Sequence, residues 1–115
     1  VTGLTASITP TATSSKVLIL VSLEGVGKHS SADRGGYRLT YGGSELQVFS
    51  QSAGDNNSTS TNFFGSSENC VYLHSPNSTS SLTYTVEGKR FNSSGALRTN
   101  CNNGYSTINL IEILA

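Results

Sequence analysis

The clearest pattern along the chain is an alternation of apolar and polar residues over positions 106–114. Polar residues at 107, 109 and 112 separate the apolar ones, and the alternation breaks only at the step from 110 to 111. This is the pattern of a half-buried strand. We expect a closing strand here, with four mostly buried side chains: Ile108, Leu110, Ile111 and Ile113.

A second strong signal lies at 16–24, where residues 17–21 form a continuous apolar run between Lys16 and Glu24. An apolar run of strand length is typical of a strand that is buried on both faces. A domain of 115 residues has few elements with which to cover both faces of one strand. The run therefore predicts that copies of the chain assemble through strand faces that are apolar or carry tyrosine.

Shorter segments of the same kind fill the chain between these two. They predict six further strands, over 4–8, 37–41, 45–49, 62–64, 70–74 and 82–86. Gly42 and Gly43 separate two of these strands and predict a tight hairpin, because primed turns need positive φ. About eight strands and no helix of ordinary length predict an all-β fold, a two-sheet antiparallel sandwich in which residues 1–115 form a single domain.

Composition excludes several classes of partner. Seven basic residues balance seven acidic ones and only 12% of the chain is charged, so the sequence offers no electrostatic footprint for nucleic acid or an anionic membrane. Residues 17–21 are too few to span a bilayer. Ser, Thr and Asn make up 43 of the 115 residues, which favours turns and strands over helices. Because the chain begins with Val1 and contains no Met, we expect a piece cut from a longer polypeptide.

Residues with catalytic potential are sparse. The sequence contains no motif for a nucleophile, a phosphate group or a metal ion, and His29 and His74 lack metal-ligand spacing. We therefore expect neither an enzyme nor a cofactor. Asp33 and Asp55 lie in different loops and are compatible with a carboxylate pair, although two solvated acids are the simpler interpretation.

The chain has two cysteines, Cys70 and Cys101. If successive strands alternate in direction, both fall at the same end of the fold, where a disulfide is geometrically feasible. Two free thiols fit the sequence nearly as well, particularly in a reducing compartment.

Long polar segments offer the candidate binding surface. With strands that alternate in direction, the connections 25–36, 51–61 and 75–80 fall at one end, and those at 10–15, 42–43, 65–68 and 90–104 fall at the other. Recognition commonly sits on loops that a rigid scaffold holds, and amide, charged and aromatic groups together can hydrogen-bond hydroxyls and stack on a sugar ring. We expect the receptor site in and beside 25–36 and 51–61, formed by Lys28, His29, Asp33, Arg34, Asp55, Asn56, Asn57, Phe63 and Phe64.

Four segments of the framework resemble a known family. They are ASITP at 6–10, SSKVLI at 14–19, LTYTV at 82–86 and STINLIEI at 106–113, and they are similar to the C-terminal tip domains of tailed-phage tail fibres of the marine and cyanobacterial type. The similarity covers the framework strands, about half of the chain, and does not extend to 25–36 and 51–61. It implies a jelly-roll sandwich at the distal end of a tail fibre in the virion, trimeric about the fibre axis.

The sequence thus predicts a non-enzymatic receptor-binding tip. It would be a homotrimer that attaches the virion to a glycan or an outer-membrane protein of the host surface, without nucleic acid or membrane insertion. The alternative is a monomeric lectin-like carbohydrate-binding module, and an enzyme such as a depolymerase fragment ranks third. Mass in solution separates the first two, because a tip should be trimeric and a binding module is usually monomeric.

Overall fold

The computed structural model describes residues 2–29, 35–53, 63–64, 67–90, 96–100 and 104–115. The elements in these ranges are strands: β1 (Thr2–Ile8), β2 (Lys16–Leu23), β3 (Gly27–His29), β4 (Gly35–Tyr41), β5 (Ser44–Ala53), β6 (Phe63–Phe64), β7 (Glu68–His74), β8 (Leu82–Arg90), β9 (Ala96–Arg98) and β10 (Thr107–Ile113). The described ranges include no helix of the length and hydropathy that a membrane crossing requires.

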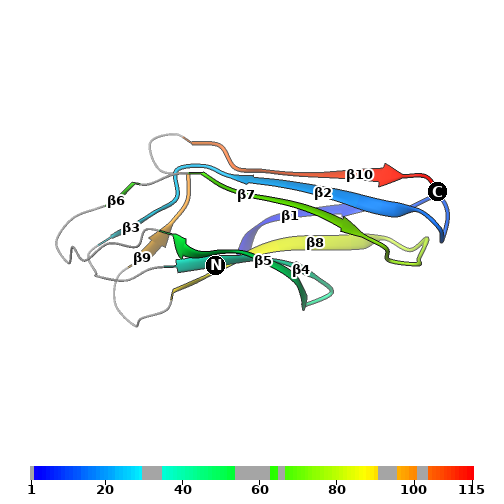
Figure 1. The fold of residues 1–115 in the computed structure, drawn as a ribbon, viewed down its shortest axis with the longest axis horizontal. Coiled ribbons are helices and arrows are strands. Elements are labelled where there is room, and N and C mark those ends of the chain that lie inside the picture. The colour runs from blue at the N-terminus through cyan, green and yellow to red at the C-terminus, as the bar shows by residue number, and fades with distance from the viewer. Residues whose placement is uncertain (1, 30–34, 54–62, 65–66, 91–95, 101–103) are drawn as a thin grey trace.

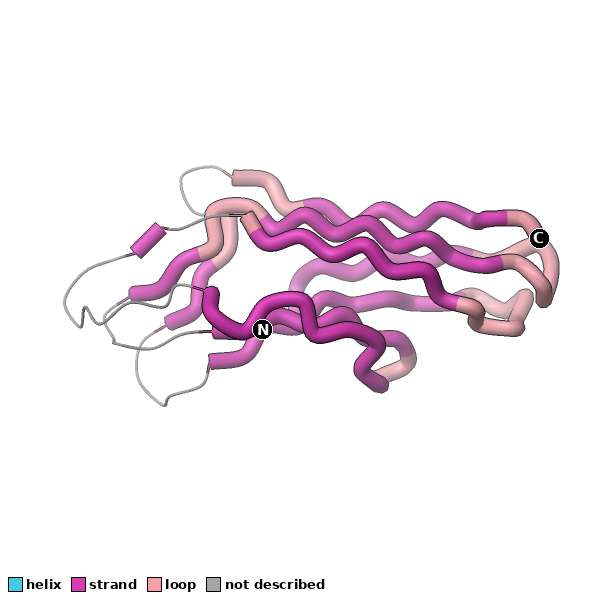
Figure 2. Tube along the Cα trace, viewed as in Figure 1, coloured by secondary structure: helices cyan, strands magenta, loops and turns pink. Residues whose placement is uncertain are grey.

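The long strands form two antiparallel sheets that lie face to face (Figures 1 and 2). One sheet has four strands in the order β1-β8-β4-β5, and the other has three in the order β10-β2-β7. Consecutive strands mostly lie in opposite sheets, as β1 and β2 or β7 and β8 do, which is the wrapping of a jelly-roll-like sandwich. The predicted all-β, two-sheet antiparallel sandwich is confirmed, with ten described strands in place of about eight.

The core lies between the sheets and consists of their inner faces. Alternate residues of β2 are at most 3% exposed: Val17, Ile19, Val21 and Leu23. The four-stranded sheet contributes the buried side chains Leu39, Leu82, Tyr84 and Val86. Because successive side chains of a strand point to opposite faces, each strand commits every second residue to this core.

Five aromatic residues on the long strands belong to the core or pack against it. Tyr37 and Tyr84 are buried, and Tyr41, Phe49 and Tyr72 pack against the core with part of their surface exposed. Tyr37 stacks on Phe49 with ring centroids 6.3 Å apart. The outer face of the three-stranded sheet therefore carries no tyrosine.

The hairpin between β4 and β5 has the predicted turn. Tyr41 pairs with Ser44, and φ is 56° at Gly42 and 82° at Gly43. Positive φ at both central residues is the mark of a type I′ turn, whose twist matches that of the strands it joins.

Residues 17–21 are covered on one face and not, as expected, on both. The burial of β2 alternates, so that Leu18 and Leu20 on its outer face are only half-buried. They lie opposite Leu73 and Val71 of β7, which are exposed. A continuous apolar run carries no period of two, and so the sequence could not distinguish a strand with one covered face from a strand with two.

The prediction for β10 is wrong for two of its four aliphatic residues. Ile108 and Leu110 pack against the core, whereas Ile111 and Ile113 are 44% and 40% exposed. The pleat puts residues 107, 109, 111 and 113 on one face, and the register with β2 turns that face outward.

The connections at the two ends are also grouped differently from the prediction. Val17 pairs with His74, so 75–80 lies at the same end as 10–15. Leu23 pairs with Glu68, so 65–68 lies at the same end as 25–36. The predicted grouping of 25–36 with 51–61 is confirmed by the pairing of Gly35 with Ala53.

A two-residue strand explains this difference. The alternating scheme treats 62–64 as a strand that crosses the sandwich, but β6 contains only Phe63 and Phe64 and pairs with β3 at one end. Counting it as a full crossing reverses the direction of every later strand. As a result, β8 ends beside Gly35, and the connection 90–104 starts at the same end as 25–36.

At the end of the sandwich that carries the 10–15 connection, hydrogen bonds join this connection to β10, and we call this contact the Thr11 clasp. The backbone N–H and the hydroxyl of Thr11 donate to Glu112 Oε1 at 2.7 and 2.9 Å. The pKa of Glu112 lies below its ordinary value of 4.5. The first cause is the buried Ser15 hydroxyl beside this carboxylate, although the geometry between the two groups falls short of a full hydrogen bond. The contacts from Thr11 lower the pKa further.

Candidate functional site

Four of the nine residues predicted for the receptor site come together in a third, small sheet. Its order is β6-β3-β9, and it lies at one end of the sandwich (Figure 1). Lys28 pairs with Phe63, and His29 pairs with Ala96. Phe64 pairs with Gly27. The other five predicted residues lie outside the described residues: Asp33, Arg34, Asp55, Asn56 and Asn57.

The small sheet is formed by three segments that lie in or beside different predicted connections. β3 lies within the predicted loop 25–36, β6 follows 51–61, and β9 lies within 90–104. The sequence predicts a strand at 62–64, but β3 and β9 have only three residues each and no detectable period, and so only the three-dimensional pairing reveals them. We call the end of the sandwich formed by β3, β6 and β9 the binding pole.

Close packing joins the binding pole to the four-stranded sheet. Leu97 of β9 lies against Gly35 and Gly88, and a Cβ atom at Gly35 would clash with its side chain. A Cβ at Gly88 would lie 2.9 Å from Cε1 of Tyr37. Tyr37 in turn donates its hydroxyl to the carbonyl of Arg98 at 3.5 Å. A side chain at 35 would have to displace the end of Leu97, and one at 88 would have to displace the ring of Tyr37, so both glycines make room for this packing.

Hydrogen bonds tie the chain after β9 to the other sheet. Asn100 N–H donates to the carbonyl of Glu24 at 2.8 Å, and the Ser106 hydroxyl donates to Asn100 Oδ1 at 2.6 Å. Glu24 N–H donates to Ser106 Oγ at 3.1 Å. Asn100 has φ of 58°, a left-handed conformation that Asn tolerates better than most residues do.

Tyr105 stands beside this network and is 84% exposed. Of the large apolar side chains that the structure describes, it is the most exposed. An exposed aromatic ring next to amide and hydroxyl groups suits stacking on the apolar face of a sugar. The sequence analysis did not single out Tyr105, because it falls in an aperiodic segment.

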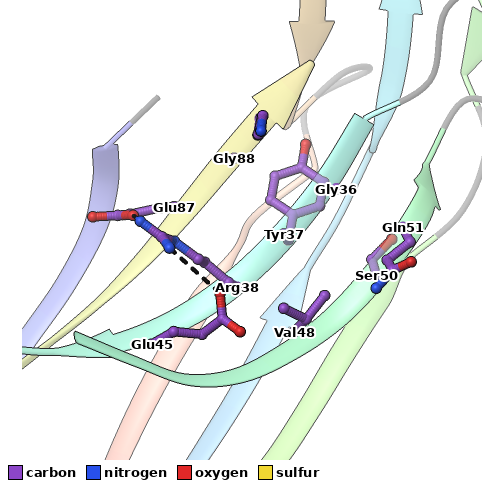
Figure 3. A pocket seen from close by; sticks show the side chains of 10 residues that line it. Gly36, Tyr37, Arg38, Glu45, Val48, Ser50, Gln51, Glu87 and Gly88 are labelled. Carbon is purple, nitrogen blue, oxygen red and sulfur yellow. Dashed lines mark hydrogen bonds and ion pairs between the residues drawn. The ribbon is translucent and has the colours of Figure 1, made fainter. Parts of the chain in front are cut away.

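A recess lies on the outer face of the four-stranded sheet next to the binding pole (Figure 3). Its volume is about 460 Å³. The strand β4 presents Gly36 here, opposite Lys89 of β8, and the missing side chain leaves a hollow between neighbouring strands. Arg38, Val48 and Gln51 are among the side chains around it. Gly36 is one position from Gly35, on which β9 packs.

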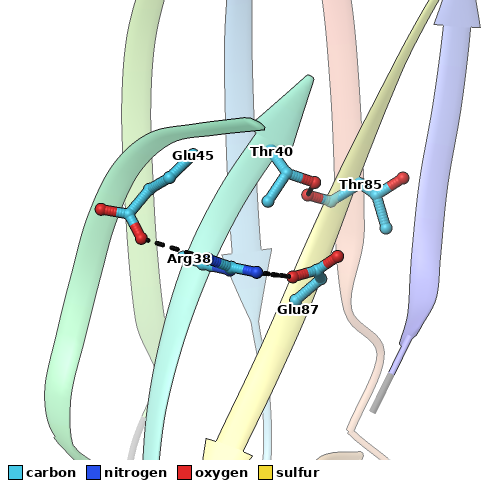
Figure 4. A network of polar contacts seen from close by, with 5 residues as sticks. All are labelled: Arg38, Thr40, Glu45, Thr85 and Glu87. Atoms are coloured by element: carbon cyan, nitrogen blue, oxygen red, sulfur yellow. Dashed lines mark hydrogen bonds and ion pairs between the residues drawn. The ribbon is translucent and has the colours of Figure 1, made fainter. Parts of the chain in front are cut away.

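Arg38 lies at the centre of a charged network at the rim of the recess (Figures 3 and 4). Its Nε and Nη2 lie 2.8 and 2.7 Å from Glu87 Oε2, and its Nη1 lies 3.4 Å from Glu45 Oε2. The hydrogen bond to Glu87, followed by that to Glu45, raises the pKa of Arg38 above its ordinary value. The guanidinium is charged, and 43% exposure of the side chain leaves it in contact with water as well as with the two carboxylates.

The chemistry of the recess is polar but electrically balanced. Arg38 and Lys89 supply two positive charges, and Glu45 and Glu87 supply two negative ones. Both contacts of Arg38 use Oε2, which leaves Oε1 of each carboxylate without a hydrogen bond within the described part of the chain. Carboxylate acceptors beside guanidinium donors match neighbouring hydroxyl groups, and zero net charge favours a neutral ligand over an anion.

Hydroxyl groups cover the rest of this outer face. Thr40 donates to the carbonyl of Thr85 at 3.2 Å (Figure 4), and Ser7 and Thr83 share a hydrogen bond of 2.8 Å. A second hollow of about 560 Å³ lies at the hairpin turn, bordered by Thr83 and Thr85. The two sheets therefore differ outside the core, one being polar and the other apolar.

His74 of β7 is surrounded by aromatic side chains of the core. Its Nδ1 lies 2.8 Å from the hydroxyl of Tyr84, and its ring lies 5.0 Å from that of Tyr41. Burial lowers the pKa of His74. Burial, and then the neighbouring Tyr41, raises the pKa of Tyr84 to about 12. Within the described residues, no group of three or more His, Cys, Asp or Glu side chains is placed to hold a metal ion.

Cys70 is a buried thiol near the start of β7, and burial raises its pKa. Cys101 lies outside the described residues. Asn100, immediately before it, is bonded to Glu24 at the end of the fold where β7 begins. The disulfide between the two cysteines stays a prediction.

Arg38, Glu45, Glu87 and Tyr105 are the candidate functional residues that the sequence analysis missed. The first three appear in the sequence only as polar positions of three different strands, and the register of β4 with β5 and β8 brings them together. A scan against models of protein families and searches of curated proteins and of solved structures find no match to this chain.

Proposed function

We propose that this domain is the receptor-binding tip of a phage tail fibre, a homotrimer at the distal end of the fibre that attaches the virion to a host-surface glycan or protein without catalysis. The observation that carries the proposal is the gathering of three short strands from separate connections at one end, in the small sheet β6-β3-β9 beside the recess. Binding sites commonly occupy such connections on a rigid scaffold.

The framework supports the resemblance to phage tips. The four resembling segments lie in or beside β1, β2, β8 and β10. β1 pairs with β8, and β10 pairs with β2. The resembling segments thus form one strand pair in each sheet of the sandwich, whereas β4, β5, β7 and the short strands of the binding pole lie outside the resemblance.

The recess favours a neutral glycan as the ligand. Its two positive and two negative side chains leave no net charge for an anionic polysaccharide, and the exposed Tyr105 adds a ring for stacking at the same end. The same chemistry supports the second candidate, a monomeric lectin-like module, which binds a similar ligand without a fibre. Light scattering separates the two by mass.

Attachment to a panel of intact bacterial cells and to their purified envelope glycans tests the proposal. Tyr105→Ala should weaken attachment roughly threefold to tenfold, the contribution of one aromatic contact. Leu114→Ala is the matched control, because Leu114 is also strongly exposed, at 71%, but lies at the opposite end. Equal attachment by both variants and the parent would contradict a site at the binding pole.

Three residues of the predicted site give a second arm of the same experiment. Arg34→Ala, Asn56→Ala and Phe64→Ala, of which the first two lie in undescribed segments and the third in β6, should each weaken attachment and leave the melting temperature almost unchanged. The bound polysaccharide should not be cleaved, which is measured as the absence of newly released reducing ends. Turnover of the glycan would replace the proposal with an enzyme.

A further inference from the structure

The outer face of the three-stranded sheet is apolar and exposed. The register of β10 with β2 and that of β2 with β7 determine which side chains lie side by side on this face, in rows across the three strands. Six aliphatic side chains share this face, which we call the aliphatic face: Leu18, Leu20, Val71, Leu73, Ile111 and Ile113. Val71 is 71% exposed and Leu73 50%.

The aliphatic face is nearly free of charge. Leu18 lies between Ile111 and Leu73 in one row, and Leu20 lies between Asn109 and Val71 in the next, so Asn109 is the polar position within the face. The structure describes every residue of these three strands, and on their outer face Lys16, at one margin, is the single charged side chain. Contiguous exposed apolar surface of this kind marks an interaction site on a soluble protein.

The size of the face suits the centre of an interface between protein chains. Three strands of seven residues cover a footprint of roughly 14 by 23 Å from ordinary strand spacing and rise. This footprint of about 320 Å² is smaller than the roughly 800 Å² that each partner buries in a standard interface, so the face would form the apolar centre of an interface that extends over its polar margins. A polar rim borders it at one end, formed by Thr107, Ser22 and Asn69.

We infer that other copies of this chain cover the aliphatic face, and that the proposed trimer forms through it. A surface without charge offers no complementarity to a charged partner, whereas the aliphatic faces of other copies can exclude water from it and are always present at equal concentration. Contacts around a threefold axis are heterologous, so each face would touch two neighbouring copies at different parts of its surface. The inference rests on the proposed function for its threefold stoichiometry. It also replaces the tyrosine-bearing interface expected from the sequence, because the strand tyrosines face the core.

Lysine substitutions on this face test the inference. By light scattering, the parent should have three times the monomer mass of 12.1 kDa. Val71→Lys and Leu73→Lys should raise the concentration at half-assembly by roughly 30-fold or more, because each places like charges in an apolar interface. Thr83→Lys is the matched control, a strand position exposed on the outer face of the other sheet, and should keep the parent's mass.

Circular dichroism and heating accompany each mass measurement. The lysine variants should be folded monomers, and if one of them unfolds, the near-isosteric Val71→Thr should weaken assembly in the same direction. Any of three results would overturn the inference: a monomeric parent, lysine variants that keep the parent's mass, or a Thr83→Lys variant that dissociates as much as Val71→Lys and Leu73→Lys do. If the parent is monomeric and still attaches to cells, the aliphatic interface is refuted but the attachment function is not. If the parent assembles and attaches to no cell, the proposed function is refuted but the interface is not.

Discussion

Two valines on neighbouring strands provide a matched test of the sandwich. Val21 of β2 is 3% exposed and faces the core, whereas Val71 of β7 is 71% exposed and faces outward. Val21 pairs with Cys70, the residue next to Val71. Truncation of each valine to alanine removes the same two carbon atoms, so that any difference in cost reports the difference in environment.

The expected costs differ about fivefold. Val21→Ala withdraws two buried carbons, worth about 1.6 kcal/mol of transfer free energy, and the cavity adds about 1 kcal/mol. Val71→Ala should cost about 0.5 kcal/mol, because less than a third of its surface is covered. Both figures refer to the free energy of unfolding of the single chain.

Urea unfolding followed by far-ultraviolet circular dichroism measures both costs. With a slope of about 1 to 1.5 kcal/mol per molar urea for a domain of this size, Val21→Ala should lower the midpoint by roughly 2 M and Val71→Ala by less than about 0.5 M. Equal shifts that do not depend on protein concentration would refute the assignment of inner and outer faces. A Val71→Ala shift that grows with protein concentration would instead report the aliphatic interface.

Three further predictions concern single contacts. Gly43→Ala should destabilise the fold by about 1 kcal/mol in thermal unfolding, because φ of 82° strains any residue with a Cβ atom; an unchanged melting temperature would contradict the type I′ turn. Gly35→Ala should push Leu97 away from the sheet, cost about 1 to 2 kcal/mol and speed amide hydrogen exchange in β9; parental exchange rates would show that the contact is not tight. Glu112→Gln should cost stability above the ordinary pKa of 4.5, where the depressed pKa of Glu112 favours the folded state, and this cost should vanish as pH falls through the folded pKa; a difference in melting temperature that is constant from about pH 6 to pH 3 would exclude the Thr11 clasp as its cause.

Periodicity was sufficient to predict the scaffold where only one face of a strand is apolar. The alternation at 4–8 and 82–86 corresponds to β1 and β8, which pair with each other, and two adjacent glycines located the hairpin. Strand pairing across about 80 residues, as between Thr5 and Thr85, left no local mark, and the sheet order could not be predicted for that reason.

The faces of β2 and β10 could not be predicted from sequence because they depend on what lies against them. Leu18 and Ile19 are similar in hydropathy, yet one is half-buried on the outer face and the other fully buried in the core. The recess is a comparable case. Arg38, Glu45 and Glu87 lie on three different strands, and they meet only because these strands pair in one particular register.

The pairing of β2 has a consequence for how the chain folds. β2 is the central strand of its sheet, between β7 and β10, and Ile19 finds its partner Leu110 only at the far end of the sequence. Topologies dominated by such distant pairs fold slowly, in milliseconds to seconds. On the ribosome, β1 must wait for β8, and β2 must wait first for β7 and then for β10 before both of its edges are paired. Chaperones that shield apolar strands during synthesis should therefore raise the yield of this domain.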